Sequence, residues 1–451
     1  MLESVPADVR ALCARLAAAG KRGWIVGGCV RDLLLGRRVA DWDIATSARP
    51  EEVIRIFRRV IPTGLKHGTV TVLERGRPYE VTTLRGEGAY SDGRHPDSVV
   101  FVDAITDDLA RRDFTVNAIA LDALTGEIID PFEGREDLAA RVLRAVGDPL
   151  ARFGEDGLRP LRACRFAATL EFEIEERTKA AIPATLETFR KVSAERIRDE
   201  WMKSLGAGHP SRAFRAMLDS SLLGEICPDL AAGAGCAQNR WHAHDVFDHT
   251  MASLDGCDSP DPVVRLAVLL HDIGKPRARA WSDEKEDWTF YEHDVLGARL
   301  AEGFLRRIRA PNDERERVVH LVRHHLVFYD DGWSDSAVRR FVRKVGTEAL
   351  DDLLAVMRAD AVGRGIPAGT AEDLERIRSL ADRVQALIAA QSAFKTSDLA
   401  IDGRDIMAAL GIGPGPKVGK VLAHLLERVL DDPTLNDREK LLTIVAEVAA
   451  E

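Results

Sequence analysis

Two aspartates, Asp41 and Asp43, alternate in the segment ADWDIAT at 40–46, which has the composition of a β-strand. Because side chains alternate between the faces of a strand, we expect both carboxylates on one face. Two such carboxylates repel each other unless a cation compensates, and their oxygens suit Mg²⁺. Glu80, in the strand-like segment 78–84, is a candidate third carboxylate, with a solvated strand residue as the alternative interpretation.

A candidate phosphate site precedes this pair. The segment VGGCVRDLLLG turns through Gly27 and Gly28 between a strand-like and a helical pattern. Glycine lets the backbone approach a ligand closely, and a helix N-terminus offers unpaired N–H groups to an anion. Arg31, one turn later, is placed to bind a phosphate with two hydrogen bonds. Next to paired carboxylates, the segment predicts metal-dependent phosphoryl transfer; taken alone, it is typical of a simple turn.

A third group follows at a regular spacing of three residues: Asp156, Arg159, Arg162 and Arg165. This spacing places side chains on one broad face of a helix, and Pro160 fits only in its first turn, so the helix should begin near Asp156. Cytosine and adenine present an amino group beside a ring-nitrogen acceptor, which matches a carboxylate next to an arginine. Asp156 with Arg159 therefore predicts selection of C and A, although a solvated basic helix face is the alternative.

Histidines and aspartates recur in a stretch that we expect to be all-helical: His249, His271, Asp272, His293, His324, His325 and Asp360. A lone histidine on an apolar helix face is usually a packed residue. The pair His271-Asp272, however, directly follows the apolar run LAVLL, where two ionisable groups are costly without a partner. Imidazole and carboxylate ligands suit a divalent transition metal.

The elements that must position these residues change along the chain. Five strand-like runs are expected in the first part: 23–28, 40–46, 68–74, 78–84 and 98–103. A helix is expected over 50–60, and helical patterns dominate from about 146 onward. The expected fold class is multidomain α+β: an α/β head with a small mixed sheet, then an all-α neck, a helical metal-binding domain and a helical tail. The expected boundaries are 1–145, 146–209, 210–365 and 366–451.

The composition limits the function classes. The 451 residues carry 63 Lys+Arg against 73 Asp+Glu, a net charge of −10. This acidic total excludes a protein that coats nucleic acid by bulk positive charge, but it permits a local basic track. The apolar runs are too short for a membrane span, the N-terminal residues lack a secretion signal, and the six cysteines are scattered, so we expect a cytoplasmic protein without a membrane partner.

The order of motifs identifies a family. GGCVRDLLLG, DWDI, VTTLRGEGAYSDGRHPDSVVF and LARRDFTVNAIA follow one another as in the bacterial tRNA nucleotidyltransferases, which include CCA-adding enzymes and poly(A) polymerases. The resemblance implies a catalytic head with Mg²⁺ at Asp41 and Asp43, and attack of a tRNA 3′ end on CTP or ATP with release of pyrophosphate. It also implies that Gly28 and Arg31 hold the triphosphate. The full set of implied nucleotide contacts is Gly28, Arg31, Arg112, Asp156, Arg159, Arg162 and Arg165.

Two segments bear on which nucleotides are added. In this family a flexible loop at the position of 85–96 goes with incorporation of A, and the segment 62–73 is similar to that of tRNA-specific members. Addition of CCA is therefore the first hypothesis. Addition of A alone and poly(A) synthesis are the alternatives.

The histidine-rich stretch resembles the HD phosphohydrolases. The resemblance assigns a possible divalent transition metal to His249, His271, Asp272 and Asp360. It makes His293, with His324 or His325, candidates for a second metal, and implies removal of a phosphate or opening of a cyclic phosphate at an RNA end. A structural metal site is the alternative, and a phosphohydrolase whose head only binds nucleotide is a second function hypothesis.

A third function hypothesis is a non-catalytic RNA-binding module, which gives no reason for the paired carboxylates. The tail resembles the C-terminal helices of the same nucleotidyltransferases. Lys417 and Lys420 there are candidate RNA-backbone contacts. The basic segment 336–344 is most simply a solvated helix face, with a contact to the tRNA as the alternative. The oligomeric state stays open.

Overall fold

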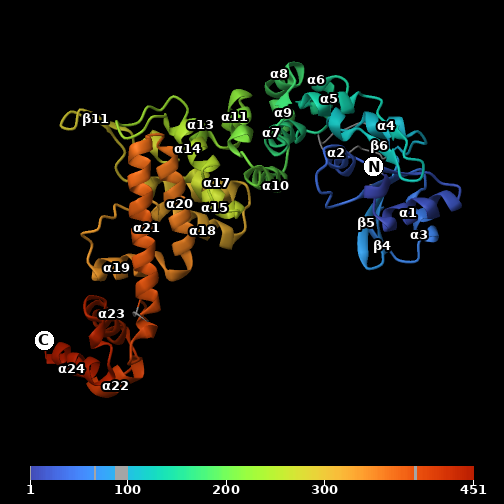
Figure 1. Cartoon of the computed structure of the whole chain (residues 1–451). Coiled ribbons are helices and arrows are strands. Elements are labelled where there is room, and N and C mark those ends of the chain that lie inside the picture. The colour runs from blue at the N-terminus through green and yellow to red at the C-terminus, as the bar shows by residue number, and fades with distance from the viewer. Residues whose placement is uncertain (1, 66–67, 87–99, 391–393, 451) are drawn as a thin grey trace. The chain divides into compact units, whose positions relative to one another are not determined.

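The computed structural model describes residues 2–65, 68–86, 100–390 and 394–450. The chain divides into two compact units, Met1–Pro228 (unit 1) and Asp229–Glu451 (unit 2). Unit 1 combines a mixed sheet with helices, and unit 2 is mostly helical (Figure 1). Within the described parts of the chain, no helix is both long enough and apolar enough to cross a membrane.

Unit 1 contains a seven-stranded sheet with the strand order β3-β4-β5-β2-β1-β6-β7. The strands are β1 (Gly23–Val26), β2 (Asp43–Thr46), β3 (Val60–Gly64), β4 (Thr69–Glu74), β5 (Arg77–Thr83), β6 (Ala120–Asp122) and β7 (Ile128–Ile129). β2 and β5 run parallel, and the other neighbouring pairs are antiparallel. The small mixed sheet expected for the head is thus confirmed.

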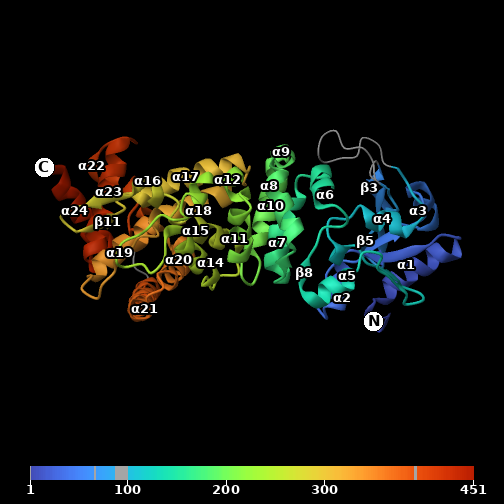
Figure 2. The same cartoon turned by 90° about the horizontal axis from the view of Figure 1, so that it is seen from above.

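Helices pack against this sheet (Figure 2). α1 (Ala7–Ala18) contacts β1, and α3 (Pro50–Ile56) contacts β4 and β5. Trp24, Val26 and Ala45 share a buried core with Ile105 and Leu109 of α4 (Ile105–Ala110). These sheet residues alternate along their strands, so one face of β1 and β2 is directed toward α4.

Four of the five expected strands are confirmed to within three residues at each end, as β1, β2, β4 and β5. In the fifth, 98–103, the described residues form only a bridge between Phe101 and Arg85. The helix expected over 50–60 ends at Ile56, and the edge strand β3 follows. Local periodicity misses β3 because its antiparallel pairing with β4 is a tertiary interaction.

The remaining helices of unit 1 are α2 (Gly28–Leu34), α5 (Gly134–Ala140), α6 (Pro149–Glu155), α7 (Arg159–Leu170), α8 (Glu176–Ala184), α9 (Leu186–Phe189), α10 (Ala194–Leu205), α11 (Ser211–Asp219) and α12 (Leu222–Ile226). The helix expected to start near Asp156 starts at Arg159, and Pro160 lies in its first turn as expected. The neck expected at 146–209 is not entirely α-helical. It contains the short strand β9 (Glu173–Ile174), which pairs with β8 (Val142–Leu143) just before it. Two-residue strands are too short to leave a periodic signal.

Unit 2 contains α14 (Val246–Asp255), α15 (Pro262–Leu270), α16 (Lys275–Ala278), α17 (His293–Arg307), α18 (Asn312–His324), α19 (Asp335–Val345), α20 (Leu350–Gly363), α21 (Pro367–Ala389), α22 (Gly403–Leu410), α23 (Pro416–Asp431) and α24 (Arg438–Ala450); α13 (Pro228–Ala231) begins at the last residue of unit 1. A short hairpin, β10 (Ala280–Ser282) with β11 (Asp287–Thr289), corrects the all-helical expectation.

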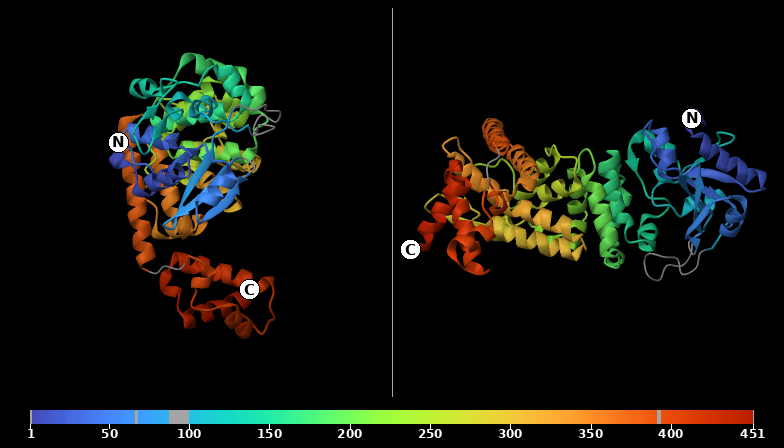
Figure 3. Two further views of the ribbon diagram at one scale, coloured as in Figure 1. Left: turned by 90° about the vertical axis from the view of Figure 1, so that its right-hand side faces the viewer. Right: turned by 90° about the horizontal axis from the view of Figure 1, so that it is seen from below.

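The helices of unit 2 form two sets of contacts. α14, α15, α18 and α20 pack on one another, and α17 packs on α18 (Figure 2). α22, α23 and α24 gather at the C-terminal end (Figure 3) around buried residues such as Ile406, Leu425 and Leu441. The four-segment division of the sequence remains a prediction.

Candidate functional site

The acidic group lies on one face of the sheet in unit 1. Asp43 is the register partner of Glu80 across the parallel pair β2–β5, and register partners point to the same face. Partial burial and the Glu80 carboxylate raise the pKa of Asp43, Arg112 lowers it, and Asp41 raises it further. An aspartate whose charge is opposed by two nearby carboxylates fits a ligand of a divalent cation.

The expectation that one strand carries both aspartates is wrong in one respect. β2 begins at Asp43, and Asp41 lies two positions before it. Sequence alternation cannot locate the end of a strand, because the end depends on where neighbouring strands stop pairing. Asp41 is exposed and close enough to influence the charge of Asp43.

The glycine turn faces an arginine. Gly27 caps α2 with φ of 77°, a left-handed conformation that favours glycine. A Cβ at Gly27 would lie 2.7 Å from Nη1 of Arg112. Arg112 is held by Asp108, whose Oδ2 accepts from its Nη2 at 3.1 Å. The turn and the guanidinium of Arg112 therefore lie together, an arrangement that suits an anion.

A cavity of about 360 Å³ joins several of the predicted residues. Its lining is Val26, Asp43, Ile44, Ala45, Thr69, Glu80, Thr82, Arg85, Asp108, Arg111, Arg112, Asp113, Asp156, Arg159 and Arg162. The described residues that line it do not include Asp41, Gly28, Arg31 or Arg165. The guanidinium of Arg31 is bound instead by Asp32 and by Oδ1 of Asn117.

Asp156 and Arg159 both line this cavity at the start of α7. Oδ1 of Asp156 accepts from the backbone N–H of Leu158 at 3.0 Å. Arg159 donates to the carbonyls of Arg152 and Arg111 and to Glu155 Oε2, at 2.6, 2.8 and 2.5 Å. These bonds use three of the five N–H groups of an arginine, so donors remain for a ligand.

Two buried carboxylates hold the other arginines of α7. Nε of Arg162 donates to Oδ2 of Asp113 at 2.8 Å, and Nε of Arg165 donates to Oε2 of Glu200 at 2.5 Å. Burial would raise the pKa of Asp113, but Arg162 and the amide of Asn117 lower it to about 2. The α7 arginines are thus fixed by paired charges.

These two carboxylates were not predicted from the sequence. Asp113 directly follows Arg112 in the motif LARRDFTVNAIA, and that position is the sequence signal that could have identified it. Glu200 lies 35 residues from Arg165 and carries no local signal. The loop expected at 85–96 lies outside the described residues from 87 onward.

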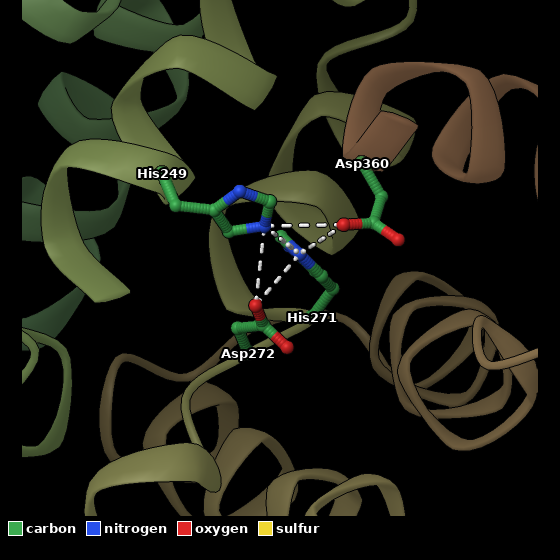
Figure 4. A group of neighbouring side chains, drawn as sticks. All are labelled: His249, His271, Asp272 and Asp360. Carbon is green, nitrogen blue, oxygen red and sulfur yellow. Dashed lines mark hydrogen bonds and ion pairs between the residues drawn. The ribbon is translucent and has the colours of Figure 1, made fainter. Parts of the chain in front are cut away.

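A second group of side chains lies inside unit 2 (Figure 4). His249 is on α14, His271 and Asp272 follow α15, and Asp360 is on α20. Nε2 of His249 lies 3.2 Å from Nε2 of His271, 3.2 Å from Oδ2 of Asp272 and 3.1 Å from Oδ1 of Asp360. All four donor atoms lie within 4.8 Å of one another, so the residues predicted from sequence do come together.

The chemistry of this group fits a divalent transition metal. His271 donates from Nδ1 to the carbonyl of Val268 at 2.6 Å, so its Nε2 is the atom directed at the other ligands. Burial opposes charge on this ring, but Asp272 and Asp360 raise the pKa of His271 to about 10. Two carboxylates and two imidazoles around one point form a donor set of the kind that binds such metals.

Asp272 also belongs to a neighbouring group with His293 and His325. Its Oδ1 lies 3.4 Å from Nε2 of His293 and 3.8 Å from Nε2 of His325. His324 is not a member of this group among the described residues, and its ring lies edge-to-face against that of His320. Nε2 of His293 is buried and makes no hydrogen bond within the described structure, as expected of a metal ligand.

A buried lysine completes the surroundings of this cluster. Lys275 lies 2.6 Å from Oδ2 of Asp272 and donates to Oε1 of Gln238 at 2.8 Å. Burial and this ammonium lower the pKa of His242 to about 3. Lys275 was not predicted from the sequence, although it follows the His-Asp pair by three positions.

The basic segments named from the sequence lie elsewhere in unit 2. Arg339, in the segment 336–344, is buried and donates to the carbonyl of Leu430 at 2.7 Å, and its neighbouring arginines pair with carboxylates of α23. The segment therefore binds the C-terminal helices rather than forming a purely solvated face. Lys417 and Lys420 are exposed on α23, and their contact with an RNA backbone stays a prediction.

Comparisons with known proteins agree with this geometry. The family model described as "Poly A polymerase head domain" matches residues 23–144, the model "Probable RNA and SrmB- binding site of polymerase A" matches 171–233, and a model for domain 2 of tRNA nucleotidyltransferases matches 279–445. A CCA-adding enzyme of Limosilactobacillus fermentum is 34% identical over 99% of both chains. One from Enterococcus faecalis is 35% identical over 94% of this chain and 92% of the relative.

A solved structure extends the likeness to the fold. The crystal structure of the Bacillus stearothermophilus CCA-adding enzyme in complex with CTP is 29% identical, with a TM-score of 0.73, and the match covers 98% of this chain and 96% of that one. The ordered motifs, the cavity that joins Asp43 to Asp156, and relatives matched over nearly their full length lead to one assignment. The chain belongs to the family of the CCA-adding enzymes, which are tRNA nucleotidyltransferases.

Proposed function

We propose that this chain adds C, C and A to the 3′ ends of tRNA, from CTP and ATP, and releases pyrophosphate. One observation carries the proposal: the carboxylates of Asp43 and Glu80 line the same cavity as the base-selecting pair Asp156 and Arg159. A cation site and a site for the Watson–Crick edge of a base are needed together in such an enzyme. The proposed partners are tRNA, CTP and ATP, and the proposed compartment is the cytoplasm.

The proposed mechanism divides the work between two groups. Asp41 and Asp43, with Glu80 beside them, would hold Mg²⁺, which when bound neutralises phosphate charge and favours loss of the proton from the 3′-hydroxyl. Arg112, next to the Gly27 turn, is placed to bind the triphosphate. The 3′-hydroxyl of the tRNA then attacks the α-phosphorus, and pyrophosphate leaves.

Base selection falls to the start of α7. The Asp156 carboxylate accepts a hydrogen bond from the amino group of C or A, and Arg159 donates to the adjacent ring nitrogen. Uracil and guanine present a carbonyl and a ring N–H at these points, so they leave both protein groups unpaired. Gly28, Arg31, Arg162 and Arg165 are proposed to support the nucleotide from around the cavity.

The test is primer extension by the full chain with Mg²⁺, CTP, ATP and three tRNAs: one that lacks CCA, one that ends in C and one that ends in CC. We expect each tRNA to be completed to CCA and not beyond. Extension of only the CC-ended tRNA would replace the proposal with A addition, and long A tails would replace it with poly(A) synthesis. Absence of any extension would refute it.

A second function is carried by the cluster in unit 2. We propose that His249, His271, Asp272 and Asp360 bind a divalent transition metal, with His293 and His325 as ligands of a second. Such a metal, when bound, would assist hydrolysis of a terminal or cyclic phosphate on an RNA end.

Separate variants distinguish the two activities. His271→Ala is expected to abolish phosphate removal and to leave CCA addition intact, and Asp41→Ala is expected to do the reverse. Loss of CCA addition in His271→Ala, with CCA addition retained in Asp41→Ala, would show that the proposal assigns nucleotide addition to the wrong unit.

A further inference from the structure

Helix α10 presents charged residues to the base-selecting helix. Arg196 lies in its first turn, and Glu200 follows one turn later. Nη2 of Arg196 donates to both oxygens of Asp156, at 3.1 Å to Oδ1 and 2.8 Å to Oδ2. Glu200 carries the opposite charge and accepts one hydrogen bond at Oε2 from Nε of Arg165. α10 therefore supplies a partner of opposite charge to each end of the selecting face.

The hydrogen bonds at Asp156 leave it little freedom. A carboxylate oxygen offers two lone-pair sites, and at Asp156 Oδ1 receives both Leu158 N–H and Arg196 Nη2. Oδ2 receives only Arg196 among the described residues, so one acceptor site remains there. Because an arginine can only donate, it holds both oxygens of Asp156 as acceptors.

The torsion that turns a carboxylate about its Cβ–Cγ bond is broad, so Asp156 has no strong orientation of its own. The pair with Arg196 is partly buried, with side-chain exposures of 21% and 20%, and an ion pair shielded in this way keeps a fixed geometry better than an exposed one. Arg196 does not line the cavity among the described residues, and acts on it through Asp156.

We propose that Arg196 is a positioning residue for base selection: it fixes the Asp156 carboxylate so that its one free acceptor site faces the incoming base. This inference rests on the proposed nucleotide addition. It assigns to α10 a role in rejecting UTP and GTP, since a carboxylate free to rotate no longer matches the amino group that distinguishes C and A.

The test compares Arg196→Met, which keeps an apolar stem and removes the donors, with Arg196→Lys, which restores a cation. We expect Arg196→Met to raise KM for both CTP and ATP about 10-fold, the loss of roughly one charge-assisted hydrogen bond, with kcat changed less than about 3-fold. The ratio of UTP to CTP incorporation should also rise about 10-fold, and Arg196→Lys should recover part of both effects. Arg198→Met is the matched control, because Arg198 on the same helix pairs with Asp199.

The outcomes separate the inference from the function on which it rests. If the unaltered chain fails to extend tRNA, the proposed function fails. If it extends tRNA and Arg196→Met keeps its KM values and its UTP rejection, the role of Arg196 is refuted. A lower kcat with unchanged UTP rejection would make Arg196 merely structural and also refute the proposal. If Arg196→Met does not fold, Arg196→Gln, with its neutral amide donor, takes its place with the same criteria.

Discussion

Replacement of Asp113 by Asn is expected to destabilise unit 1 in a pH-dependent way. The Asp113 side chain is almost completely buried; Oδ2 binds Arg162, and Oδ1 accepts from the amide of Asn117 and the N–H of Phe114. Burial opposes the charge, but Arg162 and the amide of Asn117, together with the charge of Arg159, lower the pKa of Asp113 from 3.8 to about 2. At 1.36 kcal/mol per pKa unit, the ionised carboxylate contributes about 2 kcal/mol of folding stability at neutral pH.

The sign of the pH dependence follows from the lowered pKa. A group that binds its proton more weakly when folded stabilises the fold above its unfolded pKa, and this contribution is lost as pH falls through the folded value. The contribution of Asp113 should therefore be complete above about pH 4 and decline toward pH 2. Asp113→Asn should cost about 2 kcal/mol at pH 7 and clearly less at pH 3.

The assay is equilibrium unfolding of the full chain in urea, with a short deuterium pulse that reports on peptides from α7, so that unit 1 is followed separately from unit 2. Asp103→Asn serves as the control. Asp103 is exposed and lies ten positions before Asp113, so its substitution should change the free energy of unfolding by less than about 0.5 kcal/mol. An equal loss at pH 7 and pH 3, or a loss as small as that of the control, would refute the role given to the ion pair.

Three further outcomes follow from the site geometry. Asp43→Asn should abolish nucleotide addition, yet thermal unfolding without Mg²⁺ should show no loss of stability. The reason is that partial burial and Glu80 raise the pKa of Asp43, so its charge opposes folding as pH rises. A clear loss of stability would contradict this repulsion. His325→Asn should lower the content of bound transition metal measured by mass spectrometry, whereas His324→Asn should not; equal effects would contradict the assignment of the second group. Gly27→Ala should raise KM for CTP and lower stability by about 1 kcal/mol, because φ is 77° and a Cβ would meet Arg112; unchanged kinetics would show that the turn tolerates a side chain.

The sequence predicts most of what local pattern controls. Alternation predicts four strands of the sheet, and spacing with complementary chemistry predicts the meeting of Asp156 and Arg159, which lie in one cavity. The His-Asp pair at 271–272 is likewise signalled by charge next to an apolar run. These features depend on residues that are close in sequence or on motifs that each carry their own chemistry.

Long-range pairing explains what the sequence does not show. Glu200 and Arg165 are separated by 35 positions, and nothing near either residue indicates that they meet. The choice between His324 and His325 depends on the rotation of α18 against α15 and α17, which packing decides. The boundary that leaves Asp41 outside β2 depends in the same way on neighbouring strands.

The ion pairs of the arginines in unit 1 bear on how a chain of acidic composition binds RNA. Arg31, Arg159, Arg162 and Arg165, all expected to face a nucleotide, are each paired with a carboxylate of the same unit. Each of these charges is already partly neutralised, so little of it remains to replace the counterions of an RNA backbone. A chain with a net charge of −10 can then bind the end of a tRNA through a few directed contacts in its cavity, and it can release the tRNA easily because its affinity does not come from bulk charge.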